Sequence, residues 1–326
     1  MDPSRPALLI LALVISLFVS APVALVAFPR QSTGAILITG TSTGIGRSAA
    51  IGLCARGFTV VATLRRPSAH DVQAFKHEGV SRGCLASNLH IISADVTNAT
   101  ERTQAMDALK ALNMRVAAVI NNAGVSMDLP FEFVGEDAFR NVMEVNFIAP
   151  MLLIREAIPW IKRDRGRVVT VGSIAGRLAA PGQAMYAASK HALEGAHDAL
   201  RRELLEFGVS VSMVDPGCVK SGIFKKSILA GDPSAQLTRD KYAMYARHFK
   251  HRDWVLGLCE RFAAEPDESS TVSIVHAVTD EYPKARYWPG TYTVLSGRML
   301  VWLNWALPER ILDLATAQQW PGVFTG

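Results

Sequence analysis

Six short apolar runs recur along the chain, and longer stretches with apolar residues at helical spacing separate them. Continuous, β-branched runs of this length are typical of strands buried on both faces of a parallel sheet. The stretches between them, such as GRSAAIGLCARG, predict amphipathic helices. Because strand and helix alternate, we expect an α/β fold, a Rossmann-type doubly wound parallel sheet with helices on both faces. The predicted strands are Ala35–Gly40, Thr59–Leu64, His90–Val96, Val116–Gly124, Arg167–Ser173 and Val209–Gly217.

A run without charges, Ala7–Phe28, precedes the first predicted strand. About 22 helical residues would span roughly 33 Å, enough for a hydrocarbon core of about 30 Å. We therefore expect an N-terminal transmembrane helix ahead of the sheet, kinked at Pro22. The alternative is a cleaved signal peptide, with SAPVA as its cleavage site. Arg5 and Arg30 flank the run on opposite sides, so the charges leave its orientation in the membrane open.

The predicted organisation has three parts: a membrane anchor with its flanks (1–30), a catalytic Rossmann domain (31–284) and a C-terminal extension (285–326). In the extension, the apolar piece Val294–Leu307 is too short to span a bilayer. It suits either contact with the membrane surface, through Trp302 and Trp305, or a helix that covers the substrate pocket. Within the domain, an insert at about 222–268 suits a lid over a bulky apolar ligand. Its apolar candidates are Ile223, Phe224, Ile228, Leu229, Tyr242, Tyr245 and Phe249.

Composition narrows the class of protein. The 326 residues are 49% hydrophobic and carry a net charge of +5, with the basic residues spread along the chain, so no nucleic-acid partner is expected. His248 and His251 lie three apart on a predicted helix, but without a nearby carboxylate or cysteine pattern we expect a solvated face and no metal site. Neither a zinc site nor a disulfide framework is expected from four widely spaced cysteines, Cys54, Cys84, Cys218 and Cys259.

The first predicted strand ends in TGTSTGIG, where Gly40, Gly44 and Gly46 lead into a helix. A dinucleotide pyrophosphate binds bare backbone and a helix N-terminus, and ligands of doubly wound sheets lie beyond the carboxyl ends of the strands. We therefore expect a dinucleotide at this turn. The spacing G-x-x-x-G-x-G differs from the more familiar G-x-G-x-x-G.

Further motifs follow in a recognisable order: ADV (Ala94–Val96), NNAG (Asn121–Gly124), EVNFIAP, YAASK and DPG. With these motifs, the region from Ala35 to about Ser227 resembles the short-chain dehydrogenase/reductase family. The resemblance implies four catalytic residues, Ser173, Tyr186, Lys190 and Asn146. Ser221 stands where the family usually has threonine. The implied cofactor contacts are Gly40, Ser42, Thr43, Gly44, Ile45, Gly46, Asp95, Val96, Asn122, Ala123, Gly124, Tyr186, Lys190, Pro216, Gly217, Val219 and Ser221.

Tyr186 and Lys190 lie one helical turn apart, and this spacing indicates a chemical role for the pair. A free tyrosine has a pKa near 10, and a nearby cation favours its phenolate. We therefore expect Lys190 and the positive nicotinamide ring of an oxidised cofactor, between them, to lower the pKa of Tyr186. Tyr186 then protonates the substrate oxygen in reduction and withdraws that proton in oxidation. The resemblance further implies that Lys190 binds the nicotinamide ribose and that Ser173 donates to the substrate oxygen. Asn146 would hold a water that links Lys190 to solvent.

The choice of cofactor depends on the end of the second predicted strand, ATLRRP. NAD-selective proteins generally have a carboxylate there, and Leu64 takes its place here. Arg65 and Arg66 follow, and a guanidinium can pair with the 2′-phosphate of NADP. We expect NADP(H); the alternative is an ordinary basic loop after a strand.

The expected function is a membrane-anchored, NADP(H)-dependent oxidoreductase that acts on a lipophilic alcohol or ketone, such as a steroid, a retinoid or another lipid. The C-terminal region resembles that of membrane-associated hydroxysteroid and retinol dehydrogenases, and the endoplasmic reticulum is the expected location. One alternative is a non-catalytic NADP(H)-binding regulator or scaffold. Another is an enzyme for small polar sugars or acyl thioesters, which the apolar insert disfavours.

The family resemblance also implies a homodimer. Its interface would combine the helix that holds Asn146 with the helix from Tyr186 to Phe207. Small residues on the second helix would let two helices approach closely, namely Ala192, Gly195, Ala196 and Ala199.

Overall fold

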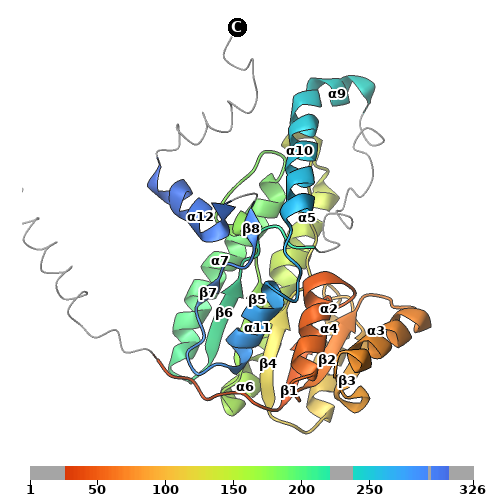
Figure 1. The fold of residues 1–326 in the computed structure, drawn as a ribbon, viewed down its shortest axis with the longest axis vertical. Coiled ribbons are helices and arrows are strands. Elements are labelled where there is room, and N and C mark those ends of the chain that lie inside the picture. Colours follow the sequence, from red (N-terminus) through yellow and green to blue (C-terminus); the bar gives the residue numbers. More distant parts are fainter. Residues whose placement is uncertain (1–25, 221–237, 293–294, 308–326) are drawn as a thin grey trace, which may run out of the picture.

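A seven-stranded sheet in the order β3-β2-β1-β4-β5-β6-β7 forms the centre of the computed structural model, which describes residues 26–220, 238–292 and 295–307 (Figure 1). All neighbouring strands are parallel, and the six predicted strands are confirmed. The sequence does not predict the seventh strand, because two residues are too few to show a hydrophobic pattern. This strand lies past the expected domain boundary at 284. The strands are β1 (Ala35–Ile38), β2 (Thr59–Leu64), β3 (Leu89–Ser93), β4 (Val116–Asn121), β5 (Arg167–Val171), β6 (Ser210–Val214) and β7 (Arg286–Tyr287).

Helices cover both faces of this sheet (Figure 1), which confirms the predicted doubly wound class. Each face has its own apolar core, because the strands are buried on both sides. One core lies under α2 (Gly44–Cys54), α3 (Ala69–Ser81) and α11 (Ser270–Thr279). The other lies under α4 (Ala99–Ala111), α6 (Ala149–Asp164) and α7 (Ala184–Leu205).

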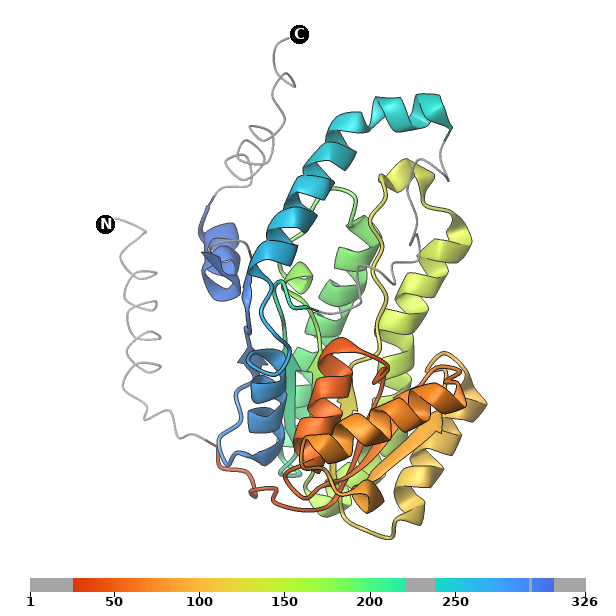
Figure 2. The ribbon, with the colours of Figure 1, turned by 45° about the vertical axis from the view of Figure 1, so that its right-hand side comes forward.

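Most of the remaining elements lie around the carboxyl ends of the strands, and α10 projects beyond them (Figure 1 and Figure 2), whereas one short turn directly precedes β3. Four are short helical turns, η1 (Ala86–Asn88), η2 (Phe131–Phe133), η3 (Glu144–Ile148) and η4 (Ile174–Gly176). The others are α5 (Glu136–Met143), α9 (Arg239–Met244), α10 (Ala246–Phe262), a small hairpin of β8 (Thr291–Tyr292) and β9 (Leu295–Ser296), and α12 (Gly297–Ala306).

The four cysteines form two disulfides, Cys54–Cys84 and Cys218–Cys259, so the expectation of no disulfide framework is wrong. The Cα atoms of the two pairs lie 5.0 and 5.2 Å apart, within the usual range for a disulfide. The partners are 30 and 41 residues apart in sequence, and only the fold brings them together. The second disulfide joins the segment after β6 to α10.

The predicted membrane span, Ala7–Phe28, lies outside the described residues except for its last three. Among residues 26–220, 238–292 and 295–307, no helix has both the length and the apolar character to cross a membrane. Phe28 already belongs to the domain, because its backbone N–H donates to Glu281 O at 2.9 Å. The buried Arg167 donates to Pro29 O at 2.7 Å. Phe28 and Pro29, which precede the predicted boundary at residue 31, therefore contact the domain.

Candidate active site

The glycine-rich turn after β1 is fastened to the turn after β4. Thr39 Oγ1 accepts hydrogen bonds from the backbone N–H groups of Asn122 (3.0 Å) and Ala123 (3.1 Å). Asn122 Nδ2 donates to the carbonyl oxygens of Thr39 and Gly40, both at 2.9 Å. Gly40 has a φ of +69°, and a Cβ there would lie 2.6 Å from Ala123 Cα. Only glycine fits, so bare backbone faces the site, as pyrophosphate binding requires.

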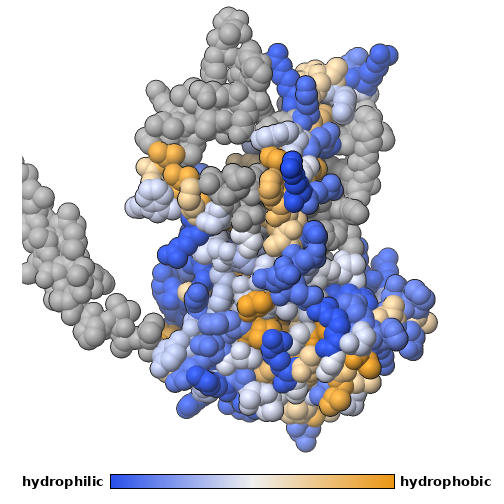
Figure 3. Space-filling model, in the orientation of Figure 1, coloured by the Kyte–Doolittle hydropathy of each residue, from blue (hydrophilic) through white to orange (hydrophobic). Residues whose placement is uncertain are grey.

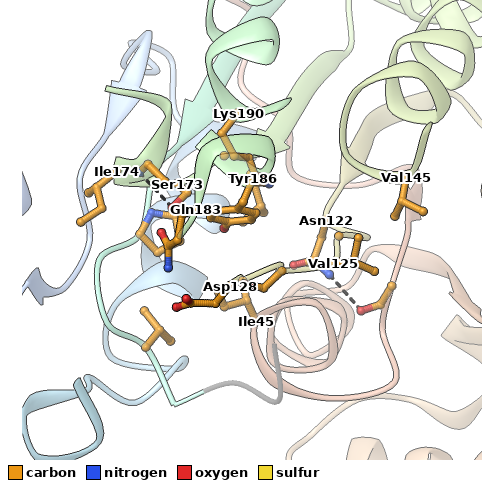
Figure 4. A pocket seen from close by; sticks show the side chains of 18 of the residues that line it. Ile45, Asn122, Val125, Asp128, Val145, Ser173, Ile174, Gln183, Tyr186 and Lys190 are labelled. Carbon is orange, nitrogen blue, oxygen red and sulfur yellow. Dashed lines mark hydrogen bonds between the residues drawn. The ribbon is translucent and has the colours of Figure 1, made fainter. Parts of the chain in front are cut away.

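A cavity of about 530 Å³ runs along the carboxyl ends of the strands (Figure 4). It brings together most of the residues predicted from sequence. At the dinucleotide end these are Gly40, Ser42, Thr43, Ile45, Arg65, Asp95, Val96, Asn122, Ala123 and Gly124. At the other end they are Ser173, Tyr186, Lys190, Pro216, Gly217 and Val219.

Some predicted residues that the structure describes do not line this cavity, namely Gly44, Gly46, Arg66, Asn146, Tyr242, Tyr245 and Phe249. Gly44 and Gly46 lie at the start of α2, where a Cβ at Gly46 would overlap the Asn122 side chain. Arg66 follows Arg65 with a φ of +49° and is exposed. Asn146 is buried behind the wall. Ser221 lies outside the described residues, as do Ile223, Phe224, Ile228 and Leu229.

At the dinucleotide end, the carboxylate of Asp95 lies near the guanidinium groups of Arg65 and Arg66. Burial raises the pKa of Asp95, but hydrogen bonds from Thr97 and the positive charges of Arg65 and Arg66 outweigh it and hold that pKa below its ordinary value. Leu64 is only 3% exposed and packs in the core under α2. The end of β2 therefore presents guanidinium groups and no carboxylate.

Ser173, Tyr186 and Lys190 meet at the opposite end of the cavity. Ser173 follows β5, and its hydroxyl shares a hydrogen bond with the Tyr186 side chain. Tyr186 and Lys190 come from α7, with Lys190 Nζ 5.8 Å from the centre of the Tyr186 ring. Figure 4 shows Ser173 beside Tyr186 on one side of the cavity, and Asn122 and Val125 on the other.

Burial shifts the pKa values of Tyr186 and Lys190 at this end of the cavity. The pKa of Tyr186 is raised, because burial outweighs the hydrogen bond with Ser173. The expected lowering of this pKa, by Lys190 together with the positive nicotinamide ring of an oxidised cofactor, concerns the protein with cofactor bound and stays a prediction. Burial also lowers the pKa of Lys190 to about 8, and only a negative charge on the nearby Asp215 would oppose this change. Lys190 thus keeps its positive charge at neutral pH and loses it in mild alkali.

Asn146 is buried behind the cavity wall and forms hydrogen bonds with Val125, one of the lining residues. It lies in η3, a π-helical turn of the kind often found at functional sites. Its Nδ2 donates to Val125 O (2.9 Å) and Ser189 Oγ (3.0 Å), and its Oδ1 accepts from Val125 N (2.9 Å). Both amide hydrogens are therefore used within the protein. The side chain joins the loop after β4 to α7.

Sequence reasoning missed part of the cavity wall. Asp128, Gln183, His248, Arg252 and Leu256 all line it. His248 is 6% exposed, with Nε2 3.7 Å from Asp128 Oδ1, so the prediction of a solvated helix face is wrong. The spacing of 248, 252 and 256 marks one face of α10 and could have revealed this wall. Within the described ranges, no three potential metal ligands gather in one place.

A dinucleotide turn and a buried Ser–Tyr–Lys group in one cavity of a Rossmann sheet define a nicotinamide-dependent oxidoreductase. The sequence pattern of the family described as short chain dehydrogenase matches residues 34–230. The chain belongs to this family.

Individual relatives agree with this assignment. The chain is 33% identical over 295 residues to 11-beta-hydroxysteroid dehydrogenase type 2 of Oryctolagus cuniculus, covering 85% of this chain and 68% of that one. It is 32% identical over 298 residues to retinol dehydrogenase 5 of Mus musculus, covering 87% and 89%. A solved short-chain dehydrogenase from Streptomyces avermitilis superposes with a TM-score of 0.64 and 25% identity, covering 89% and 97%. The protein is thus an enzyme that oxidises alcohols or reduces their carbonyl counterparts with a nicotinamide cofactor.

Proposed function

We propose that this enzyme interconverts a lipophilic alcohol and the corresponding ketone or aldehyde, with NADP(H) as cofactor and Tyr186 as the acid–base residue. One observation carries the proposal: the Tyr186 hydroxyl, bonded to Ser173, faces the end of the cavity that also holds Pro216 and Gly217. A carbonyl placed there would meet a proton donor and a second hydroxyl donor at once.

Each residue of this group has a separate task. Ser173 donates a hydrogen bond to the substrate oxygen and orients it. Tyr186 gives its proton to that oxygen in reduction and takes it back in oxidation. The nicotinamide supplies or accepts the hydride when it is bound. Lys190 contributes the positive charge that a buried tyrosinate needs, because burial alone raises the pKa of Tyr186.

The proposed cofactor is NADP(H). Arg65 lines the dinucleotide end of the cavity, Arg66 follows it, and both lie close enough to Asp95 to lower its pKa. A 2′-phosphate on the adenosine ribose would meet these two guanidinium groups. No carboxylate stands at the end of β2 to accept hydrogen bonds from the ribose hydroxyls of NAD.

The proposed substrate class is lipophilic. The substrate end of the cavity includes the apolar side chains of Val145, Ile174, Val255 and Leu256, beside the polar side chains of Asp128, Gln183, His248 and Arg252. A steroid or retinoid would bury its apolar surface against the first group and meet the second with its polar substituents, whereas a polar sugar would gain little from the apolar group. The names of the hydroxysteroid and retinol dehydrogenase relatives point to the same class.

Turnover of matched carbonyls tests the proposal. Purified full-length protein would be incubated with NADPH and a steroid ketone, a retinaldehyde or a small keto-sugar. We expect NADPH oxidation with a lipophilic carbonyl and none with the sugar, and no turnover in a Tyr186→Phe control that still binds NADPH. Turnover restricted to the sugar would refute the substrate class, and equal turnover in the control would refute the acid–base assignment.

We also propose that residues 1–30 attach the enzyme to the endoplasmic reticulum membrane. Apolar side chains gather on α12 (Figure 3), where Met299, Trp302 and Trp305 are 46%, 59% and 83% exposed, and they suit a second contact with the membrane surface. After deletion of residues 1–25, a carbonate wash of the membranes should release the protein in active form. A longer deletion would also remove Phe28 and Pro29, which contact the domain. Retention of the shorter variant on membranes would make α12 the main attachment.

A homodimer through α5, α6 and α7 is proposed on the family resemblance. These helices expose Phe139 (40%) and Ile148 (39%), together with the small residues Gly195 and Ala199. Light scattering of detergent-solubilised protein should give twice the monomer mass. A lone monomer at micromolar concentration would contradict this assembly.

A further inference from the structure

The face of α7 that carries Tyr186 and Lys190 continues into a buried cluster of charges. Glu194 lies one turn beyond Lys190 and is 4% exposed. Its Oε2 accepts hydrogen bonds from Arg177 Nη2 (2.7 Å) and Arg286 Nε (2.8 Å). These arginines come from the segment after η4 and from β7, so two parts of the chain converge on one carboxylate oxygen.

Asp215 approaches the same carboxylate from the end of β6. It is fully buried and immediately precedes the Pro216–Gly217 turn. Its carboxyl lies against Gly172, the residue before Ser173, and any Cβ at Gly172 would overlap it. A backbone hydrogen bond also joins the turn after β5 to the turn after β6, because Ile174 N donates to Pro216 O at 3.2 Å. Asp215 thus lies directly behind the catalytic serine.

Three carboxyl oxygens of this cluster lack a hydrogen-bond donor in the described part of the chain unless one carboxyl keeps a proton. No donor among the described residues bonds to either oxygen of Asp215 or to Glu194 Oε1. Yet the side chains of Asp215 and Glu194 lie within hydrogen-bond reach of each other. Two carboxylates cannot bond, because both are acceptors, whereas a carboxylic acid and a carboxylate form a strong hydrogen bond.

The surrounding charges decide which group keeps the proton. Two guanidinium groups bind Glu194 directly, so the negative charge of the pair stays there. Burial, followed by the negative charge of Glu194, raises the pKa of Asp215 well above its ordinary value, against the opposing charges of Arg286 and Lys190. The remaining neighbours are Asp198, which pairs with Arg286 at 3.1 Å, and His197, which burial keeps neutral.

We propose that Asp215 and Glu194 share one proton and act as a positioning pair for the proposed reaction. The shared proton fastens the turns that carry Ser173 and Gly217 to the helix that carries Tyr186 and Lys190. Neither Asp215 nor Glu194 lines the cavity. They act by fixing the distance between the serine and tyrosine hydroxyls. The inference rests on the proposed function, since it needs turnover as a readout.

The test compares three substitutions in the full-length enzyme. Asp215→Asn keeps the size of the side chain and offers an amide N–H to Glu194 Oε1, as the protonated acid does. Asp215→Ala removes that donor. We expect Asp215→Asn to keep at least about a third of the wild-type kcat, and Asp215→Ala to lower kcat by about tenfold to a hundredfold, the range for a displaced catalytic group. Asp198→Asn is the matched control, because this half-exposed carboxylate pairs with the same arginine; it should change kcat by less than about threefold.

Each outcome has a defined meaning. Equal losses in Asp215→Asn and Asp215→Ala would show that an ionised Asp215 is needed, and would overturn the shared proton. Near-wild-type kcat in Asp215→Ala would overturn the positioning role. An inactive wild-type enzyme would instead refute the proposed function and leave the infrared test below to decide the proton.

Infrared spectroscopy tests the proton without turnover and without the alanine variant, which could fail to fold. The wild-type spectrum at neutral pH should contain the carbonyl stretch of a buried carboxylic acid, and the spectrum of Asp215→Asn should lack it. The same band in both proteins, or in neither, would overturn the proposal. Retention of NADPH affinity in Asp215→Asn would show that this variant is folded.

Discussion

Lys190 Nζ donates a hydrogen bond to the carbonyl oxygen of Val171 at 3.2 Å, at the end of the strand that leads to Ser173. One backbone oxygen therefore fixes the Lys190 ammonium relative to Ser173. The same ammonium lies 5.8 Å from the centre of the Tyr186 ring, within reach of a cation–π interaction.

Replacement of Tyr186 by phenylalanine should abolish turnover and change NADPH affinity by no more than about threefold, because the lost hydroxyl is needed for proton transfer and not for binding. Single-turnover kinetics and fluorescence titration with NADPH measure the two effects separately. A phenylalanine variant with a kcat close to that of the wild type would remove Tyr186 from the mechanism.

Cofactor affinity should fall as pH rises through about 8. Burial lowers the pKa of Lys190 to about 8, so its positive charge is present below that pH and lost above it. A hydrogen bond to a charged group contributes about 1.5–3 kcal/mol, so affinity should drop by about tenfold to a hundredfold between neutral pH and strong alkali. Calorimetric titrations with NADPH across this range measure the change. In Lys190→Met the affinity should be lower throughout and independent of pH; a wild-type curve equally flat would contradict the role of Lys190.

His197 should make the fold less stable in mild acid. Burial, aided by the positive charge of Arg286, lowers its pKa to about 4, and neither ring nitrogen has a partner among the described residues. Below about pH 6.5 the unfolded chain binds a proton that the folded protein does not, so the free energy of unfolding falls by about 1.4 kcal/mol per pH unit until about pH 4. Urea unfolding measures this slope, and His197→Met should reduce it by that amount. Parallel slopes in the two proteins would show that His197 is not buried as a neutral ring.

The fold could be predicted from sequence because its strands are apolar on both faces and long enough to show it. β7 could not be predicted, since its two residues, Arg286 and Tyr287, form no apolar run that would mark a strand. Motif order was enough to predict that Ser173, Tyr186 and Lys190 share one site, whereas the contact between Asp128 and His248 could not be predicted, because it depends on how α10 packs. The disulfides escaped for the same reason: the distance between Cys218 and Cys259 is a property of the fold, not of the spacing along the chain.

The two disulfides predict the side of the membrane on which the enzyme works. Disulfides persist in secretory compartments and are rare in the cytosol, so the catalytic domain should face the lumen. Alkylation of unreduced protein should then label none of the four cysteines, and alkylation after reduction should label all of them.

An exposed glycosylation sequence gives an independent readout of the same orientation. Asn98, Ala99 and Thr100 are all exposed at the start of α4. Asn98 caps that helix through Oδ1, which accepts from Glu101 N at 3.2 Å and leaves Nδ2 available for a glycan. Synthesis with microsomes should give a protease-protected protein whose gel mobility changes on glycosidase treatment, and Asn98→Gln should not show that change. Protease-sensitive protein with four free thiols would place the domain in the cytosol.

The proposed preference for NADP(H) depends on Arg65, which follows β2 and lines the dinucleotide end of the cavity. Arg65→Ala should weaken NADPH binding by about tenfold to more than a hundredfold, because a charged hydrogen bond contributes about 1.5–3 kcal/mol, and should barely change NADH. Arg66→Ala should have a smaller effect, since Arg66 does not line the cavity. Leu64→Asp is not a suitable converse, because Leu64 is 3% exposed and a carboxylate there would be buried in the core. The measurement is kcat/KM with both cofactors for the wild type and the two arginine variants. A wild type that prefers NADH, or an Arg65→Ala variant with unchanged preference, would show that these guanidinium groups form an ordinary basic loop.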